Sequence, residues 1–181
     1  EEAIEVGADT LIRVGSSGSM QPHIHSGDVV VVTAAIRDEG TTPYYLPIEF
    51  PAVADIAVVN ALREAAVRLG FRSHTGIAQS KDSFYGEVER TRMPMAARLA
   101  DRWNAFIAGG AACSEMESSA LFILSSINRK RAGGVMLVIN ESDLAEVDED
   151  DASKHMVEFD ADRVIKVAVE ALKILIQADR K

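Results

Sequence analysis

The segment GDVVVVTAAI, residues 27–36, places the strongest constraint on the fold of this 181-residue chain. Its apolar residues are mostly β-branched, which favours an extended strand, and they do not alternate with polar residues. A strand with one face in water shows such alternation, so this strand is expected to be covered on both faces. We therefore predict a sheet that lies between layers of helices.

Extended and helical patterns alternate along the rest of the chain. Extended patterns are predicted at residues 10–15, 73–80, 111–119 and 133–142, and helical patterns at 51–70, 94–110, 117–131 and 161–177. Strands joined by crossover helices indicate an α/β fold with a mixed, largely parallel sheet. We expect a single three-layer domain over residues 1–181. We also expect it to lack an N-terminal part, because the chain starts inside an amphipathic stretch without an initiator methionine.

Charge and cysteine content argue against several classes of function. The formal net charge is −9 and the sequence pI is about 4.9, so neither nucleic acid nor an anionic membrane is an expected partner. The single cysteine, Cys113, excludes an internal disulfide and fits a reducing cytoplasm. The acidic stretch 146–151 is predicted to be a solvated loop rather than a cation site. His23 and His25 lack a partner in metal-ligand spacing, so no metal is predicted.

Three segments carry residues suited to ligand binding, and the first is RVGSSGSMQP, residues 13–22. A predicted buried strand runs here into a Gly/Ser-rich turn at residues 15–18. Such a turn presents backbone N–H groups and hydroxyls at the sheet edge where ligands bind. Gly15 allows close approach, and Arg13 offers a fork of donors to an oxyanion. The alternative is an ordinary turn with Arg13 in a salt bridge.

The second segment is KDSFYGEVERTRMP, residues 81–94. Phe84 follows a predicted strand, and Glu87, Arg90 and Arg92 come soon after it. An aromatic ring beside hydrogen-bonding groups suits a flat heterocycle, which stacks on the ring while the polar groups bind its edge. A charged surface loop with one packed aromatic ring is the alternative interpretation.

The third segment, CSEMES at residues 113–118, places two carboxylates beside an apolar helix. In an extended segment, Glu115 and Glu117 point to one side and Met116 to the other. A carboxylate accepts hydrogen bonds well from two vicinal hydroxyls, so a ribose is a natural ligand. Alternatively, Glu117 begins the next helix, where an acid interacts favourably with the positive end of the helix.

In this order, RVGSSGSMQP, GDVVVVTAAIRDEG, LPIEFPAVAD, KDSFYG and SEMESSALF resemble the nucleoside phosphorylase family over essentially the whole chain. PIEFPAVAD and DSFYG favour its uridine phosphorylase branch. The resemblance implies that uridine and inorganic phosphate give uracil and ribose 1-phosphate, by direct transfer through an oxocarbenium-like transition state and without a cofactor. This agrees with the lack of a nucleophile elbow or P-loop in the sequence.

The resemblance also implies roles for individual residues in binding phosphate and ribose. The implied phosphate-binding residues are Arg13, Gly15 and Ser16, and the ribose-binding candidates are Glu115, Met116 and Glu117. Within the second set, Glu117 is the expected acceptor for the two sugar hydroxyls, and Glu115 is the less certain member. We expect Glu117→Ala to reduce turnover far more than Glu115→Ala.

The loop after Phe84 is implied to bind the edge of the base, with Phe84 packing on the base or sugar. Many uridine phosphorylases have glutamine and arginine in this loop. An ungapped overlay places Val88 at the glutamine and Arg90 at the arginine, whereas a shifted overlay places Glu87 at the glutamine and uses Arg92. An ionised glutamate accepts from an N–H but cannot donate to a carbonyl oxygen.

VINESD, residues 138–143, is a second departure from the uridine branch. Some uridine enzymes have an arginine directly after this asparagine, where this chain has Glu141. Ser142 and Asp143 resemble a pair in purine-cleaving relatives, whose acid protonates the purine ring. Glu141 and Asp143 are therefore pocket candidates, with an ordinary loop acid as the alternative for Asp143. A purine nucleoside phosphorylase or a nucleosidase of the same fold is the alternative activity.

Assembly is a further implication of the resemblance. It implies a homo-oligomer, in which dimers assemble into a hexamer and sites are shared between neighbouring subunits. The apolar composition of the loop at residues 41–51 is consistent with partner contact or with covering the substrate. In this family the N-terminal part supplies more of the phosphate site. We therefore expect this chain to be inactive by itself and to depend on a separate N-terminal segment. A non-catalytic nucleoside-binding relative or an inactive fragment is the alternative outside catalysis.

Overall fold

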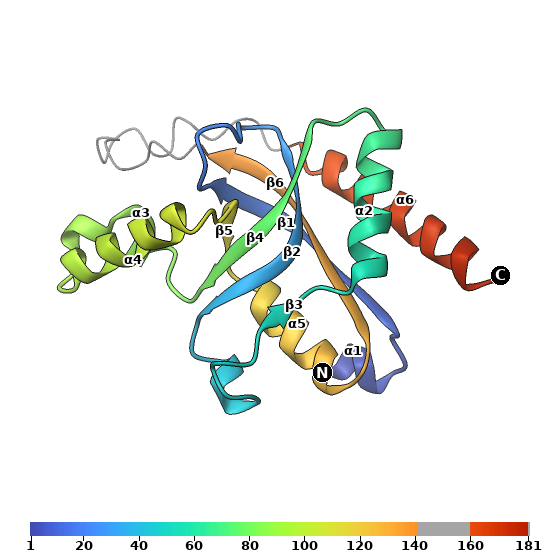
Figure 1. Cartoon of the computed structure of the whole chain (residues 1–181), viewed down its shortest axis with the longest axis horizontal. Coiled ribbons are helices and arrows are strands. Elements are labelled where there is room, and N and C mark those ends of the chain that lie inside the picture. Colours follow the sequence, from blue (N-terminus) through green and yellow to red (C-terminus); the bar gives the residue numbers. More distant parts are fainter. Residues whose placement is uncertain (141–159, 181) are drawn as a thin grey trace.

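The computed structural model describes residues 1–140 and 160–180, and its architecture is a mixed sheet flanked by helices (Figure 1). In chain order the elements are α1 (Glu2–Glu5), β1 (Thr10–Ser19), β2 (Val29–Asp38), the 3-10 helix η1 (Thr42–Tyr44), β3 (Ala52–Val53), α2 (Ile56–Arg68), β4 (Ser73–Lys81), α3 (Tyr85–Val88), η2 (Arg90–Arg92), α4 (Ala96–Ala108), β5 (Cys113–Glu115), α5 (Ser118–Ile127), β6 (Arg131–Asn140) and α6 (Asp162–Asp179). Within these described residues, no helix combines the length and apolar character needed to cross a membrane.

The strands form one sheet in the order β3-β2-β4-β5-β1-β6, and β6 also pairs with β2. The sheet therefore closes on itself. Its long pairings, β1 with β6 and β2 with β4, are parallel, as predicted. Three short pairings complete the closure: β5 pairs antiparallel with β1 and parallel with β4, and β2 pairs antiparallel with β6. The sequence did not predict this closure, because pairings of two to four residues leave no periodic pattern in the sequence.

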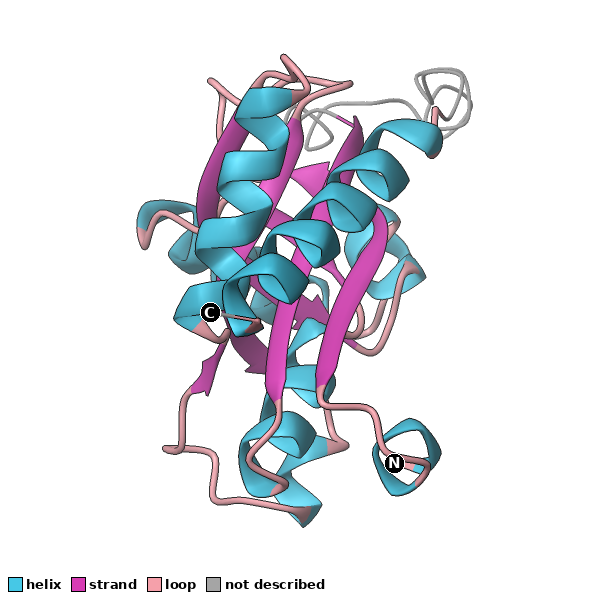
Figure 2. Ribbon diagram, turned by 90° about the vertical axis from the view of Figure 1, so that its right-hand side faces the viewer, coloured by secondary structure: helices cyan, strands magenta, loops and turns pink. Residues whose placement is uncertain are grey.

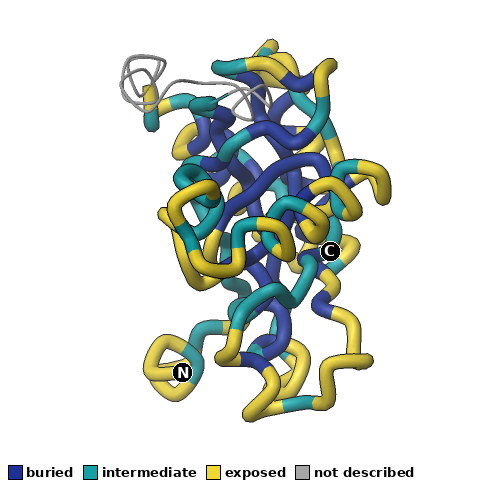
Figure 3. Tube along the Cα trace, turned by 90° about the vertical axis from the view of Figure 1, so that its left-hand side faces the viewer, coloured by how far each residue is buried: buried dark blue, intermediate teal, exposed yellow. Residues whose placement is uncertain are grey.

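Helices cover the sheet on both sides and bury the valine-rich strand. α2 and α6 pack side by side across the strands in front, and Figure 2 shows further helices behind the strands. α5 packs against β2, β3 and β6. The four valines of β2, residues 29–32, have no exposed surface and belong to a core cluster shared with α2, α5 and α6 (Figure 3). The prediction of a strand covered on both faces is confirmed.

The predicted start of the helix at Pro51 is wrong, because α2 begins at Ile56. Asp55 caps the helix: its Oδ1 accepts from two backbone N–H groups of the first turn, at 2.9 and 3.1 Å. The residues before the cap stay extended because β3 pairs with β2. The predicted end is confirmed, since Gly70 follows the helix with a φ of 72°, a conformation that favours glycine.

The predicted turn at residues 15–18 is also wrong. β1 continues to Ser19, because residues 15–17 pair with residues 136–138 of β6 and residues 18–19 then pair with β5. A register shift between Ser17 and Gly18 marks the place where the strand changes its pairing. The Gly/Ser-rich segment therefore forms an extended wall and not a loop.

The apolar loop at residues 41–51 is tied to the sheet by Arg37. The Arg37 guanidinium donates to the backbone carbonyl oxygens of Leu46 and Phe50, at 2.7 Å each. Tyr44 and Ile48 project outward and are exposed. A role of this loop in partner contact stays a prediction.

Cys113 provides a test of how tightly β5 is packed. Its thiol is fully buried, and burial raises the pKa of the thiol to about 12. The thiolate is the reactive form, so little of it exists at neutral pH. We expect the native protein to resist a thiol reagent at neutral pH, and the urea-unfolded protein to react at one thiol per chain. Rapid reaction of the native protein would show that β5 is accessible.

Candidate functional site

The ends of β1, β5 and β6 and the short helix α3 surround a cavity of about 160 Å³, with the last residue of β4 in its wall. Distant parts of the sequence meet here because β5 pairs with both β4 and β1. The predicted site residues that line the cavity are Arg13, Ser16, Phe84, Glu87, Glu115, Met116 and Glu117. The structure thus brings together the three segments singled out in the sequence.

The Glu115 carboxylate is buried and bound by structural donors. Its Oε2 accepts from the backbone N–H groups of Glu117 at 2.9 Å and Ser118 at 3.0 Å, and its Oε1 accepts from the Ser80 hydroxyl. N–H groups in the first turn of a helix have no partner within the helix, so a fixed carboxylate stabilises them. These contacts favour a structural role for Glu115, at the junction of β4, β5 and α5.

The different contacts of the two glutamates predict different effects on stability. Glu115→Ala leaves a hydroxyl and two backbone N–H groups without an acceptor, which costs about 1–3 kcal/mol for each buried group. Glu117 has a side chain that is 57% exposed, so Glu117→Ala is expected to change the free energy of unfolding by less than about 0.5 kcal/mol. Urea denaturation measures both values, and equal midpoints for the two variants would contradict the assignment.

Arg13 and Glu117 form an ion pair at the mouth of the cavity. Arg13 Nε donates to Glu117 Oε2 at 3.0 Å, and Nη2 donates to the same oxygen. Arg13 Nη1 donates to the backbone carbonyl of Val14 at 2.7 Å, which holds the guanidinium over its own strand. The cation predicted to bind phosphate and the carboxylate predicted to bind ribose are therefore in direct contact.

Gly15 makes room for the Arg13 guanidinium. A Cβ at position 15 would stand 2.1 Å from Arg13 Nη1 and 2.5 Å from Cζ, both closer than atoms can approach. The obstructing atoms are the end of a flexible side chain, so Arg13 can move while the strand stays in place. The sequence predicted that Gly15 lets phosphate approach. The structure adds that this glycine sets the position of Arg13.

Gly15→Ala is accordingly expected to displace Arg13 without unfolding the protein. Because Arg13 is predicted to bind phosphate, loss of this charge-assisted contact is expected to raise the KM for phosphate about tenfold, with little change in the unfolding midpoint. The matched control is Gly40→Ala, at a position outside both cavities where an added Cβ meets only Asp82 Oδ2, at 3.4 Å, an ordinary contact distance. Steady-state kinetics with phosphate as the varied substrate distinguish the two variants, and equal KM values would contradict the assigned role.

Phe84 and Met116 supply the apolar part of the cavity. Phe84 is half-exposed, and its ring meets the Tyr85 ring edge to face, with centroids 5.6 Å apart. Met116 leaves β5 directly after Glu115 and is also partly exposed. A partly exposed ring and a thioether at a cavity wall suit the packing of a flat ring.

The two candidate arginines of the base loop take different positions. Arg90 Nε donates to the backbone carbonyl of Glu87 at 3.1 Å, and its guanidinium lies over the Trp103 ring, 4.9 Å from the centroid. Arg90 lines a second cavity of about 170 Å³. Arg92 pairs with Glu89 and lines neither cavity. Base binding by either arginine stays a prediction.

The candidates Glu141 and Asp143, and the acidic stretch 146–151, lie outside the described residues. In the described part of the chain, no group of three or more His, Cys, Asp or Glu side chains has the arrangement of a metal site. The expectation that the protein needs no metal or cofactor stays a prediction.

Comparison with known proteins agrees with this geometry. The family model described as the phosphorylase superfamily matches residues 1–178. The chain belongs to the phosphorylase superfamily. It is 48% identical over 179 residues to a uridine phosphorylase of Treponema pallidum (strain Nichols), covering 99% of this chain and 68% of that protein. It is 35% identical over 182 residues to a uridine phosphorylase of Escherichia coli (strain K12), covering 97% and 69%. A guanosine phosphorylase of Halorubrum lacusprofundi is 30% identical over 178 residues, covering 97% and 69%.

Sequence reasoning missed several residues in the cavity of this superfamily member. Lys81, Trp103, Ser114 and Asn140 line it alongside the predicted residues. The position of Lys81, directly after a predicted buried strand, was a usable signal, because a lysine is seldom buried without a partner. Trp103 lies in the amphipathic helix α4, where an aromatic residue is indistinguishable from an ordinary core residue.

Proposed function

We propose that the protein catalyses the phosphorolysis of uridine to uracil and ribose 1-phosphate. The observation that carries this proposal is the cavity in which Arg13, Glu117 and Phe84 meet. They offer a cation for phosphate, a carboxylate for sugar hydroxyls and an aromatic ring for the base. Similarity to proteins named uridine phosphorylase, at 48% and 35% identity, supports the same substrate.

In the proposed reaction, Arg13 and the Ser16 hydroxyl hold phosphate against one face of the sugar, and Glu117 accepts hydrogen bonds from two sugar hydroxyls. The bond between the sugar carbon and the base nitrogen breaks, and its electron pair leaves with the base, which then takes up a proton. A phosphate oxygen forms the new bond to that carbon. Positive charge that develops on the sugar is stabilised by the nearby phosphate and by Glu117.

In this proposal, each substrate replaces one partner of the Arg13–Glu117 ion pair when it binds. Phosphate takes guanidinium donors of Arg13, and the sugar hydroxyls donate to the Glu117 carboxylate. The Glu117 side chain is 57% exposed and that of Arg13 is 24% exposed. Exposed ion pairs contribute about 0–1 kcal/mol, so exchanging this contact for substrate contacts costs little.

A substrate panel tests the proposal directly. The intact protein is incubated with uridine, thymidine, inosine, guanosine or adenosine, with and without phosphate, and the released base is measured by chromatography. We expect phosphate-dependent release of uracil at the highest kcat/KM. Release without phosphate would indicate a nucleosidase, and preference for a purine would indicate a purine phosphorylase. Binding of uridine without turnover would indicate a non-catalytic relative. Each of these results would contradict the proposal.

Assembly and location belong to the same proposal. We propose a hexamer built from dimers, with sites shared between subunits, in the cytoplasm. The family resemblance supports the assembly, and the single cysteine is consistent with a reducing compartment. The expectation that the 181-residue chain is inactive by itself stays a prediction, and the uridine assay on that chain tests it.

A further inference from the structure

We infer that Lys81 is a positioning residue: it holds the Glu87 carboxylate so that one oxygen faces the cavity as a fixed acceptor for the ring N–H of uracil. This inference rests on the proposed function. It assigns a role to a residue that the motifs did not single out, and it defines how the base would be selected.

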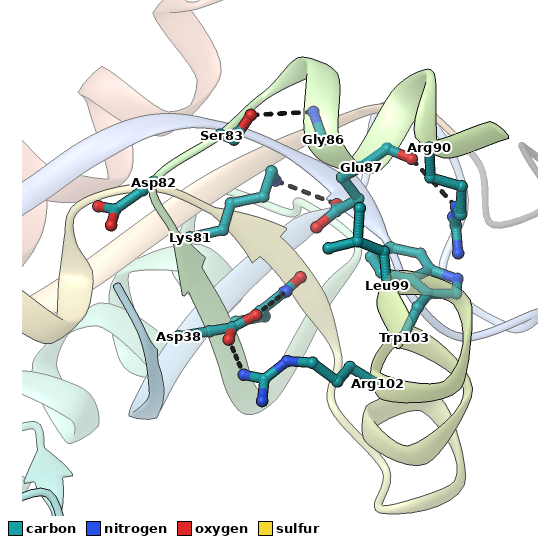
Figure 4. A pocket seen from close by; sticks show the side chains of 11 residues that line it. Asp38, Lys81, Asp82, Ser83, Gly86, Glu87, Arg90, Leu99, Arg102 and Trp103 are labelled. Atoms are coloured by element: carbon teal, nitrogen blue, oxygen red, sulfur yellow. Dashed lines mark hydrogen bonds and ion pairs between the residues drawn. The ribbon is translucent and has the colours of Figure 1, made fainter. Parts of the chain in front are cut away.

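The first observation is a closed set of contacts around one oxygen of Glu87. Lys81 Nζ lies 3.1 Å from Glu87 Oε1 and donates to Ser114 Oγ at 2.5 Å. Ser114 Oγ lies 2.8 Å from the same Oε1 and 2.9 Å from Gln79 Oε1, and its one hydroxyl hydrogen is shared between these two acceptors. Figure 4 shows Lys81 reaching across from the end of β4 to Glu87 on α3. The two elements that meet at the base end of the cavity are therefore joined by this ion pair.

The second observation is the burial of the pair. The side chains of Lys81 and Glu87 are only 10% and 13% exposed. Removing two charges from water is costly, and apolar residues of similar volume often stabilise a fold as well or better. Stability alone therefore gives no reason for a charged pair here. The location of the pair gives such a reason. Lys81, Glu87 and Trp103 line both cavities and so form the wall between them.

The third observation concerns the second oxygen of Glu87. Lys81 and Ser114 occupy Oε1, whereas no hydrogen bond within residues 1–140 and 160–180 ends on Oε2. An ionised carboxylate accepts and never donates, so Oε2 needs an N–H or O–H from a ligand. Uracil in a nucleoside has one ring N–H between two carbonyls. Neutral cytosine has an unprotonated nitrogen at that position and would repel the carboxylate.

The charge of Lys81 supports this arrangement because the ammonium group attracts the Glu87 carboxylate and keeps it in place, with Nζ 3.1 Å from Oε1. Other charged groups also face Glu87 or line the cavities beside it. These groups are Arg90 on η2, Asp82 after β4, Arg102 on α4 with its partner Asp38 on β2, Arg13 on β1 with its partner Glu117, and Glu115 on β5. Arg102 and Asp38 neutralise each other, and Glu115 is bound to the start of α5. Lys81 is the cation in direct contact with the Glu87 carboxylate.

The test compares the intact protein with Lys81→Met, which keeps an unbranched apolar stem of similar size and removes the ammonium group. We expect the KM for uridine to rise about tenfold at neutral pH, with a smaller change in kcat. Lys173→Met, at an exposed site on α6, is the control and should behave as the unmodified protein.

A second pair of variants covers the case in which Lys81→Met does not fold. Glu87→Leu removes the carboxylate and leaves no acceptor for Lys81 to hold, and the double variant Lys81→Met with Glu87→Leu removes both charges. If Lys81 acts only through Glu87, these two variants have the same KM for uridine. A double variant much weaker than Glu87→Leu would overturn the inference, because it would mean that Lys81 acts on the ligand itself.

Calorimetry with uracil supplies a readout that does not require turnover. We expect uracil to bind about tenfold more weakly to Lys81→Met than to the unmodified protein, and cytosine to bind neither. Unchanged uracil affinity in Lys81→Met overturns the inference even if uridine is cleaved. Failure of the unmodified protein to cleave uridine instead contradicts the proposed function, so the two failures are distinguishable.

Discussion

The backbone pairing of β5 is the constraint on which the arrangement of the site depends. This strand has three residues, 113–115, yet it pairs with β4 on one side and with β1 on the other. The pairing fixes the end of the strand that carries Lys81 beside the strand that carries Arg13. The buried Glu115 carboxylate then holds the start of α5, so Met116 and Glu117 emerge beside the same cavity. A short strand thus determines where the binding residues lie.

Two ion pairs in this cavity differ in exposure, and that difference suits different tasks. Arg13 and Glu117 are partly exposed, so exchanging their contact for water or a ligand costs little. Lys81 and Glu87 are nearly buried, and separating them would leave an uncompensated charge, which costs several kcal/mol. The first pair is therefore suited to exchange with phosphate and sugar. The second is suited to holding an acceptor still while a base binds.

The sequence predicted those features that depend on local pattern. Four consecutive valines indicated a strand covered on both faces, and the segments around Arg13, Phe84 and Glu117 are indeed brought to one cavity. The prediction of a turn at residues 15–18 was wrong. It relied on the low strand propensity of glycine and serine, but these residues are extended because they pair with β6 and β5. The role of Lys81 was missed because its partners, Glu87 and Ser114, come from a short helix and a three-residue strand whose positions only the tertiary structure defines.

The central claim is that one cavity, at the junction of β1, β4 and β5, holds both substrates. A crystal structure of the intact protein with phosphate and a non-cleavable uridine analogue measures this most directly. The account predicts phosphate on Arg13 and Ser16, the sugar hydroxyls on Glu117, and the base between Phe84 and Glu87. Density for the analogue or phosphate in the second cavity, with the first cavity empty, would contradict it.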